Sequence, residues 1–114
     1  MNKVNRQNAE HYIWGDNCEG WRLVNSPELS IINEKMPPGT SEKKHCHKKA
    51  KQFFFIVDGM ASIETEEKIY HLEKHEGLEI LPGIKHRFFN SSDGTIEFIV
   101  TSNPSTLNDR FDVD

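Results

Sequence analysis

The stretch that decides the fold is "HCHKKAKQFFFIV", residues 45–57. It begins with two histidines one residue apart and ends in five consecutive apolar side chains. Side chains alternate between the two faces of a strand, so Gln52 and Phe54 share one face. Phe53 and Phe55 share the opposite face. Both faces of this segment are therefore apolar, which predicts a strand that is covered on both sides.

A second stretch, "HEGLEILPGIKHRFFN", residues 75–90, contains a proline-glycine turn followed by His86. Histidines at positions i and i+2 of a strand project side by side, which is how we expect His45 and His47 to lie. His86 can meet them only if two hairpins fold over each other, as they do in a small antiparallel barrel. Three neutral imidazoles facing one cavity suit zinc, nickel, copper or iron.

The rest of the chain predicts an all-β fold. Turn signals recur at short intervals, for example "NSPE" at 25–28, "MPPGT" at 36–40 and "NSSDGT" at 90–95. Short segments rich in valine, isoleucine, phenylalanine and tyrosine lie between them, which is typical of a sandwich or barrel. The chain shows no repeat or linker, so we expect one domain over residues 1–114. Residues 1–24 are expected to pack on the barrel or on a partner subunit.

Size and composition exclude several classes of function. A chain of 114 residues is long enough for one core but not for two. The formal net charge of -4 argues against nucleic-acid binding. No apolar run reaches the length of a membrane span, and residues 1–15 lack the apolar core of a signal peptide. We therefore expect a cytoplasmic protein in which Cys18 and Cys46 are free thiols.

Taken together, the two stretches resemble the paired motifs of the cupin superfamily, in particular its small, RmlC-like single-domain members. Motif one would span residues 39–59 and motif two residues 75–90. The residues that match are Gly39, His45, His47, Gln52 and Gly59 in the first motif, and Gly83, His86 and Asn90 in the second. The resemblance implies a double-stranded β-helix, or jelly-roll barrel, with one divalent metal ion inside it. The metal ligands that it implies are His45, His47, Gln52 and His86.

Gln52 departs from the family, which usually has glutamate at this position. Its amide oxygen can complete a set of four protein ligands. Alternatively, its N–H can donate a hydrogen bond to a neighbouring group without Gln52 binding the metal. Glutamine is neutral and a weaker ligand than carboxylate, so we expect lower metal affinity than at a glutamate site. The identity of the metal (Zn, Fe, Ni, Mn or Cu) stays open.

The resemblance leaves the chemistry open, because one fold hosts many functions. We expect a metal-binding protein that acts on or binds a small molecule inside the barrel, for example a metal-dependent oxygenase or isomerase. The alternatives are a non-catalytic binding or sensor protein, with or without metal. No catalytic residue is assigned, although a glutamate near Gln52 would be suited to handling protons.

Four further expectations concern the surroundings of the site. The apolar face of Phe53 and Phe55 would be exposed on a lone barrel, which predicts a homodimer. Trp14 and Trp21 are expected to cap one barrel end or to pack outside the Phe53 strand. The orientation of Glu34 stays open across the turn that follows it. The tail, residues 102–114, is expected to form a surface or interface segment, with Arg110 at the mouth of a pocket as the less favoured alternative.

Overall fold

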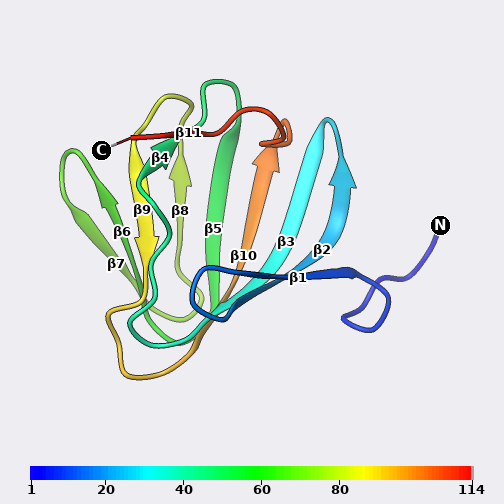
Figure 1. Cartoon of the computed structure of the whole chain (residues 1–114), viewed down its shortest axis with the longest axis horizontal. Helices are drawn as coiled ribbons and strands as arrows, with labels where there is room; N and C mark the ends of the chain where they lie inside the picture. Colours follow the sequence, from blue (N-terminus) through cyan, green and yellow to red (C-terminus); the bar gives the residue numbers. More distant parts are fainter. Residues whose placement is uncertain (114) are drawn as a thin grey trace.

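The computed structural model describes residues 1–113, which form eleven β-strands and no helix. The strands make two antiparallel sheets that face each other (Figure 1). In order across the larger sheet, the strands are β1 (Glu10–Trp14), β2 (Cys18–Ser26), β3 (Leu29–Met36), β10 (Ile96–Asn103), β5 (Lys51–Asp58) and β8 (Gly77–Ile80). Across the smaller sheet they are β11 (Phe111–Asp112), β4 (His45–Cys46), β9 (His86–Phe89), β6 (Ala61–Thr65) and β7 (Ile69–Leu72).

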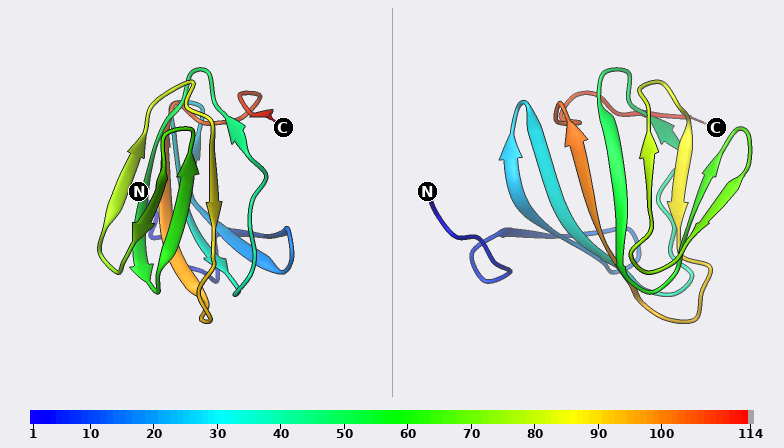
Figure 2. Two further views of the ribbon diagram at one scale, coloured as in Figure 1. Left: turned by 90° about the vertical axis from the view of Figure 1, so that its left-hand side faces the viewer. Right: turned by 180° about the vertical axis from the view of Figure 1, so that it is seen from behind.

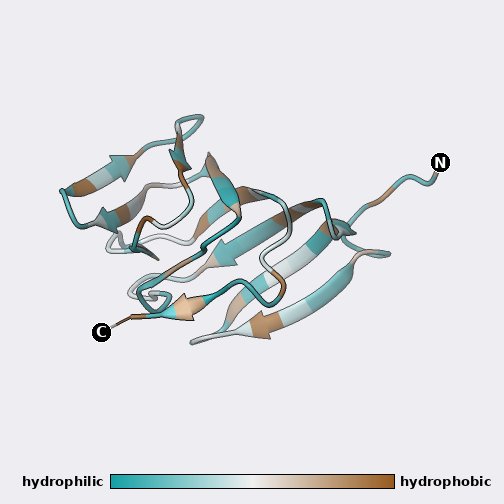
Figure 3. Cartoon of the chain, turned by 90° about the horizontal axis from the view of Figure 1, so that it is seen from above, coloured by the Kyte–Doolittle hydropathy of each residue, from teal (hydrophilic) through white to brown (hydrophobic). Residues whose placement is uncertain are grey.

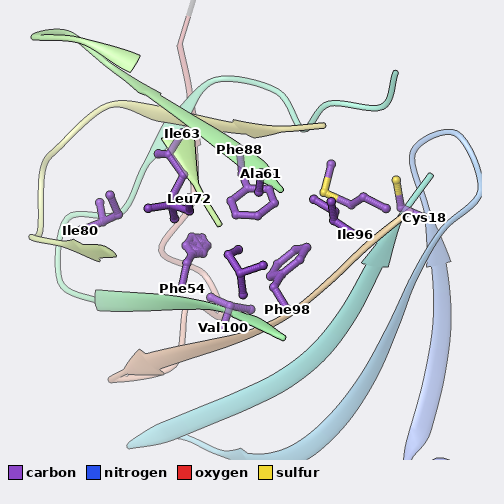
Figure 4. Packing of buried hydrophobic residues seen from close by; sticks show 12 residues of the cluster. Cys18, Phe54, Ala61, Ile63, Leu72, Ile80, Phe88, Ile96, Phe98 and Val100 are labelled. Carbon is purple, nitrogen blue, oxygen red and sulfur yellow. The ribbon is translucent and has the colours of Figure 1, made fainter. Parts of the chain in front are cut away.

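The core lies between the two sheets and is built from the inward-facing residues of both (Figure 4). Phe54 and Phe98 come from the larger sheet and Phe88 from the smaller one. The ring centroids of Phe88 and Phe98 are 4.2 Å apart, and those of Phe54 and Phe88 are 5.0 Å apart. These tilted aromatic contacts join the sheets at the centre of the molecule.

The alternation predicted for β5 is confirmed. Gln52 and Phe54 point inward and are 8% and 4% exposed, whereas the outward-facing Phe53 is 44% exposed. Hydrophilic and hydrophobic residues alternate in the same way along other strands, as Figure 3 shows when the molecule is seen from above. No other part of residues 1–113 buries Phe53, so the second layer expected over this face does not come from this chain.

The N-terminal strands extend the larger sheet instead of covering β5. β1 pairs with β2 and β2 with β3, so β1 forms the edge of the sheet and three strands separate it from β5 (Figure 2). Trp21 lies on the outer face of β2, with the Arg6 guanidinium carbon 4.4 Å from its ring centroid. Trp14 turns inward and packs against the core. The two tryptophans therefore lie on opposite faces of the sheet, and neither covers Phe53.

Two expectations from the sequence, on the cysteines and on membrane spans, can be compared with the structure. Cys18 and Cys46 are both buried and free, as predicted. The described chain contains no helix that could span a membrane.

Candidate metal centre and its cavity

The three histidines lie close together on the inner side of the smaller sheet, where all three are buried. His45 begins β4, His86 begins β9, and these two residues pair directly across the ladder. His47 follows β4 by one residue. The ring centroid of His45 is 4.8 Å from that of His47 and 4.6 Å from that of His86. One ring nitrogen from each histidine lies within 4.8 Å of the others, close enough to hold a single metal ion.

Each histidine is held through its Nδ1 atom. A backbone carbonyl accepts a hydrogen bond from Nδ1 in every case: Lys43 for His45 (2.7 Å), Asp109 for His47 (2.7 Å) and Ile84 for His86 (2.8 Å). A carbonyl can only accept, so Nδ1 carries the proton and Nε2 presents its lone pair. The Nε2 atoms of His47 and His86 are buried without a hydrogen-bond partner in residues 1–113. Three oriented imidazoles with free Nε2 atoms fit a divalent metal.

Burial also keeps the three imidazoles neutral. It lowers the pKa of His45 to about 3, and the nearby Arg110 guanidinium contributes to that shift. Burial lowers the pKa of His47 and of His86 as well. Neutral imidazole is the form that binds metal, so the site is ready to bind at neutral pH without first losing protons.

Gln52 faces the same site from β5 in the larger sheet. Its Nε2 donates a hydrogen bond to Ser102 Oγ at 3.0 Å, on the paired residue of β10. Its Oε1 is buried without a hydrogen-bond partner in the described chain. The amide lies near enough to His47 to offset part of the lowering of that residue's pKa by burial. The side chain thus has its donor satisfied and its acceptor free, which suits a metal ligand.

The metal centre lies at the wall of a cavity of about 280 Å³ between the sheets. Apolar side chains cover part of this cavity, and polar ones gather around the histidines and on the wall near β1. Its lining residues are Tyr12, Trp14, Arg22, Ile32, Glu34, Glu42, His45, His47, Gln52, Phe54, Phe88, Phe98, Val100, Ser102, Thr106 and Arg110. A cavity of this size holds a small molecule.

Glu34 points into the cavity, which settles the orientation that the sequence left open. It pairs with Gly20 of β2, and a side chain at Gly20 would collide with the Tyr12 ring. Gly20 therefore lets the phenol of Tyr12 lie beside Glu34. Burial, together with the nearby Glu42 carboxyl, raises the pKa of Glu34 to about 8, although the Trp14 indole opposes part of that rise. Glu34 therefore retains its proton at neutral pH.

Glu42 is the second carboxyl group of the cavity. Its Oε1 accepts a hydrogen bond from the backbone N–H of Phe88 at 2.9 Å. Burial raises the pKa of Glu42 to about 7 even though this hydrogen bond and the Arg110 guanidinium oppose the rise. Glu42 therefore titrates near neutral pH, below Glu34. Neither carboxyl group could be placed in the cavity from the sequence, because side-chain alternation cannot be followed across the turn between β3 and β4.

The C-terminal segment lies at the surface, as predicted, with Leu107 and Phe111 exposed. Arg110 lines the cavity, which was the less favoured alternative, and Asp109 was not expected to be buried but is only 6% exposed. The Asp109 carboxylate accepts hydrogen bonds from three consecutive backbone N–H groups, those of Lys48, Lys49 and Ala50, at 2.9–3.0 Å. The tail is therefore joined to the loop after His47, and no local pattern in residues 102–114 signals this contact.

Comparison with known sequence families agrees with this geometry. Residues 33–102 match the sequence model of the cupin domain. The chain belongs to the cupin family. The matched region contains both predicted motifs and all three histidines of the metal centre.

Solved cupin structures share the fold at low sequence identity. An RmlC-like cupin from Shewanella frigidimarina superposes with a TM-score of 0.83 at 17% identity, covering 95% of both chains. The polyketide cyclase RemF from Streptomyces resistomycificus gives 0.82 at 16% identity, covering 100% of this cupin and 86% of that chain. A cupin-superfamily sugar phosphate isomerase from Silicibacter pomeroyi gives 0.80 at 17% identity, covering 91% and 76%. These likenesses show the double-stranded β-helix fold, as predicted.

One curated protein is related in sequence. It is a polyketide synthase protein, CurC, from Streptomyces cyaneus, 26% identical over 69 residues. The match covers 60% of this cupin and 45% of that relative, so the chain spans less than half of the relative's length.

Proposed function

We propose that this cupin holds one divalent metal ion and is an enzyme that moves protons on a small molecule bound in the cavity, as an isomerase or cyclase does. The proposed metal ligands are His45, His47, Gln52 and His86. The observation that carries the proposal is a group of unpartnered, buried acceptor atoms: Nε2 of His47 and His86, in a histidine cluster whose ring nitrogens lie within 4.8 Å of one another, and Oε1 of Gln52 near His47. Leaving such atoms unpaired costs about 1–3 kcal/mol each, and a bound cation removes that cost.

When bound, the metal supplies a Lewis acid that polarises an oxygen atom of the ligand. The side chains of the cavity supply the rest. Gln52 is an amide and cannot act as a base, whereas Glu34 and Glu42 line the same cavity with pKa values of about 8 and about 7. A carboxyl group that titrates near the working pH is suited to give and take protons.

The names of the structural neighbours agree with proton-transfer chemistry. One is a sugar phosphate isomerase and another a polyketide cyclase. Both reaction classes move protons at carbon atoms next to a carbonyl group. This supports the isomerase alternative over the oxygenase alternative, together with the two proton-carrying glutamates of the cavity.

The first experiment measures metal. Protein purified without chelators is analysed for its elements and then titrated with zinc, iron, nickel, manganese and copper. We expect about one divalent ion per chain. A protein that contains no metal and binds none on titration contradicts the proposal at its first step.

The second experiment separates an enzyme from a binding protein. The metal-loaded protein is incubated in D₂O with a panel of hydroxy-ketones, sugar phosphates and β-dicarbonyl compounds, and deuterium incorporation is followed by proton NMR. We expect exchange at a carbon next to a carbonyl group, and its loss in Glu34→Gln. Saturable binding of these compounds with no exchange in any of them favours the non-catalytic binding protein instead.

A homodimer is also part of the proposal. The outer face of the larger sheet exposes Phe53, with Phe55 and Ile99 beside it on paired strands. An exposed apolar face of this kind often marks an interface, and a two-fold dimer would cover it with the same face of a second copy. Light scattering at micromolar concentration should give a dimer mass, and Phe53→Ser should shift it toward the monomer. A monomer mass for the unmodified chain contradicts this part of the proposal.

Two smaller proposals complete the assignment. We take residues 1–114 as a single cupin domain with its N-terminal strands packed on the barrel, since β1 and β2 continue the larger sheet. A cytoplasmic location is supported by the two buried cysteines, which are free.

A further inference from the structure

The C-terminal segment places the positive charge of the half-exposed Arg110 side chain at the edge of the cavity. It leaves β10, crosses the top of the molecule and joins β4 (red in Figure 1). Phe111 pairs with Cys46 and Asp112 with His45, so Arg110 occupies the next position along, beside His47. Side chains alternate along β11, and Arg110 therefore faces the same side as the metal centre, in agreement with its place in the cavity lining.

Asp109 fixes this position. Its two carboxylate oxygens accept three backbone hydrogen bonds from the loop after His47, and its backbone carbonyl accepts one from His47 Nδ1. Burial alone would raise the pKa of Asp109, but the three N–H donors hold it below its usual value. The carboxylate is therefore charged at neutral pH and keeps Arg110 beside the histidines.

The guanidinium of Arg110 has donors to spare. Its Nε donates to Asp112 Oδ1 at 3.0 Å, and its two terminal nitrogens have no hydrogen-bond partner within residues 1–113. Its charge acts on the interior, because it lowers the pKa of all three histidines and of both cavity glutamates. The two terminal nitrogens of a guanidinium group can donate a pair of hydrogen bonds to a carboxylate, which they match in shape and charge.

The charge of the site needs an anion. A divalent cation on three neutral histidines and a neutral Gln52 keeps its full double charge. Arg110 adds a positive charge close by, and the half-exposed Asp112 carboxylate pairs with its Nε at 3.0 Å. Of the two cavity glutamates, Glu34 keeps its proton at neutral pH. Two like charges in a partly buried cavity repel each other unless a negative group lies between them.

We propose that the cavity binds a small carboxylate with a second oxygen on the neighbouring carbon, a 2-oxo or 2-hydroxy acid, and that Arg110 binds its carboxylate group. The second oxygen faces the histidines. The inference rests on the proposed metal site, and it deepens the proposed function by naming the class of ligand. It also gives the C-terminal segment a role in ligand selection.

The test uses the full chain loaded with cobalt(II), whose visible absorption reports ligand binding. Cobalt is titrated first, and then oxalate and imidazole are titrated separately as an anionic and a neutral probe. We expect Arg110→Gln to weaken oxalate binding about 10- to 100-fold and to leave imidazole binding within about twofold. Arg110→Lys should lie between, because it keeps the charge and loses the fork.

Lys49→Gln is the matched control. It removes one positive charge from the loop that Asp109 holds, but its side chain is exposed and outside the cavity lining. Oxalate binding to this variant should stay within about twofold of the unmodified protein. Thermal unfolding of Arg110→Gln checks that the C-terminal segment stays in place.

The outcomes separate the two proposals. Absence of cobalt binding in the unmodified protein rejects the metal site, and the ligand class falls with it. Normal cobalt binding with oxalate affinity unchanged in Arg110→Gln overturns the role of Arg110 alone. Inorganic phosphate that binds as tightly as oxalate, with the same dependence on Arg110, overturns the preference for carboxylates.

Discussion

The two ends of the interior differ in chemistry although the same strands build both. At one end Gln52 of β5 pairs with Ser102 of β10, next to the histidines. Four pairs further along, Ile56 lies opposite Phe98 and both are almost fully buried. The interior thus changes from a polar cavity to a closed apolar core within four residues of β5.

The apolar end stabilises the fold through buried apolar area, whereas the unpartnered polar atoms of the other end lower the free energy of unfolding. Buried apolar area contributes about 25 cal/mol per Å², whereas each unpartnered buried polar atom costs about 1–3 kcal/mol. The core residues of the apolar end, among them Ile63 and Ile96, are fully buried. Substitutions at the two ends should therefore separate into effects on stability and effects on metal binding.

The largest expected effect lies at the apolar end. Ile63→Ala removes a fully buried side chain from β6 and should lower the free energy of unfolding by about 2–5 kcal/mol. Urea unfolding measures this change. Ile69→Ala on the neighbouring strand, where the side chain is 45% exposed, is the control and should change stability by less than about 0.5 kcal/mol. A loss of metal affinity in folded Ile63→Ala would break the separation between the two ends.

The second effect lies at the polar end. His47→Ala should lower metal affinity by more than about 100-fold, because it removes a proposed ligand and not merely a supporting group. Calorimetric titration with zinc measures this affinity. His71→Ala is the matched control, since His71 contacts Ser62 and lies outside the cavity. Equal zinc affinity in the two variants would show that His47 is not a ligand.

The third effect concerns Gln52 and decides between ligation and support. If its amide oxygen binds the metal, Gln52→Glu offers a stronger, negative oxygen at the same reach, and affinity should rise by about tenfold. If Gln52 instead supports a ligand through a hydrogen bond and does not bind the metal itself, the variant loses its N–H donor and metal affinity should fall by about 10- to 100-fold. A competition titration with a chelator gives the sign. Ser102→Ala, which removes only the partner of the amide, is the control.

The smallest expected effect is a pH dependence at the wall opposite the histidines. The pKa of Glu34 is raised from 4.5 to about 8, so the folded state binds its proton more tightly than the unfolded state does. The stability from this group is present below the unfolded pKa and is lost as pH rises through the folded pKa. Glu34→Gln should therefore gain stability relative to the unmodified protein between about pH 5 and about pH 9. The full shift would correspond to roughly 5 kcal/mol, but the side chain is only partly buried, so solvent screening should reduce the gain to the order of 1 kcal/mol.

This pH effect is measured as a difference between two proteins. The lowered pKa values of the three histidines reduce stability on the acid side, below their unfolded value of 6.5, in both proteins alike. They cancel when urea unfolding of the two proteins is compared at each pH. A constant difference across this range would mean that Glu34 is ionised throughout and does not carry a proton at neutral pH.

The sequence by itself determined the strands and the three histidines. Alternation along a strand is a local property of the backbone, so the inward direction of Gln52 and Phe54 and the outward direction of Phe53 followed from the order of residues. The resemblance of the paired motifs to those of cupins implied that His45, His47 and His86 meet, and the structure brings them together. The position of Gln52 as a ligand stays a prediction.

Only the tertiary structure decided what surrounds the histidines. Arg110 lies beside His47 because Asp109 binds three backbone N–H groups about sixty residues earlier in the chain, a contact that no local pattern encodes. Glu34 faces the cavity because it shares the inward face of β3 with Ile32 and Met36, and Gly20 leaves room for Tyr12 beside it. The physical reason is the same in both cases. Local backbone geometry sets the face of a strand, but contacts between distant segments set which charges share a cavity.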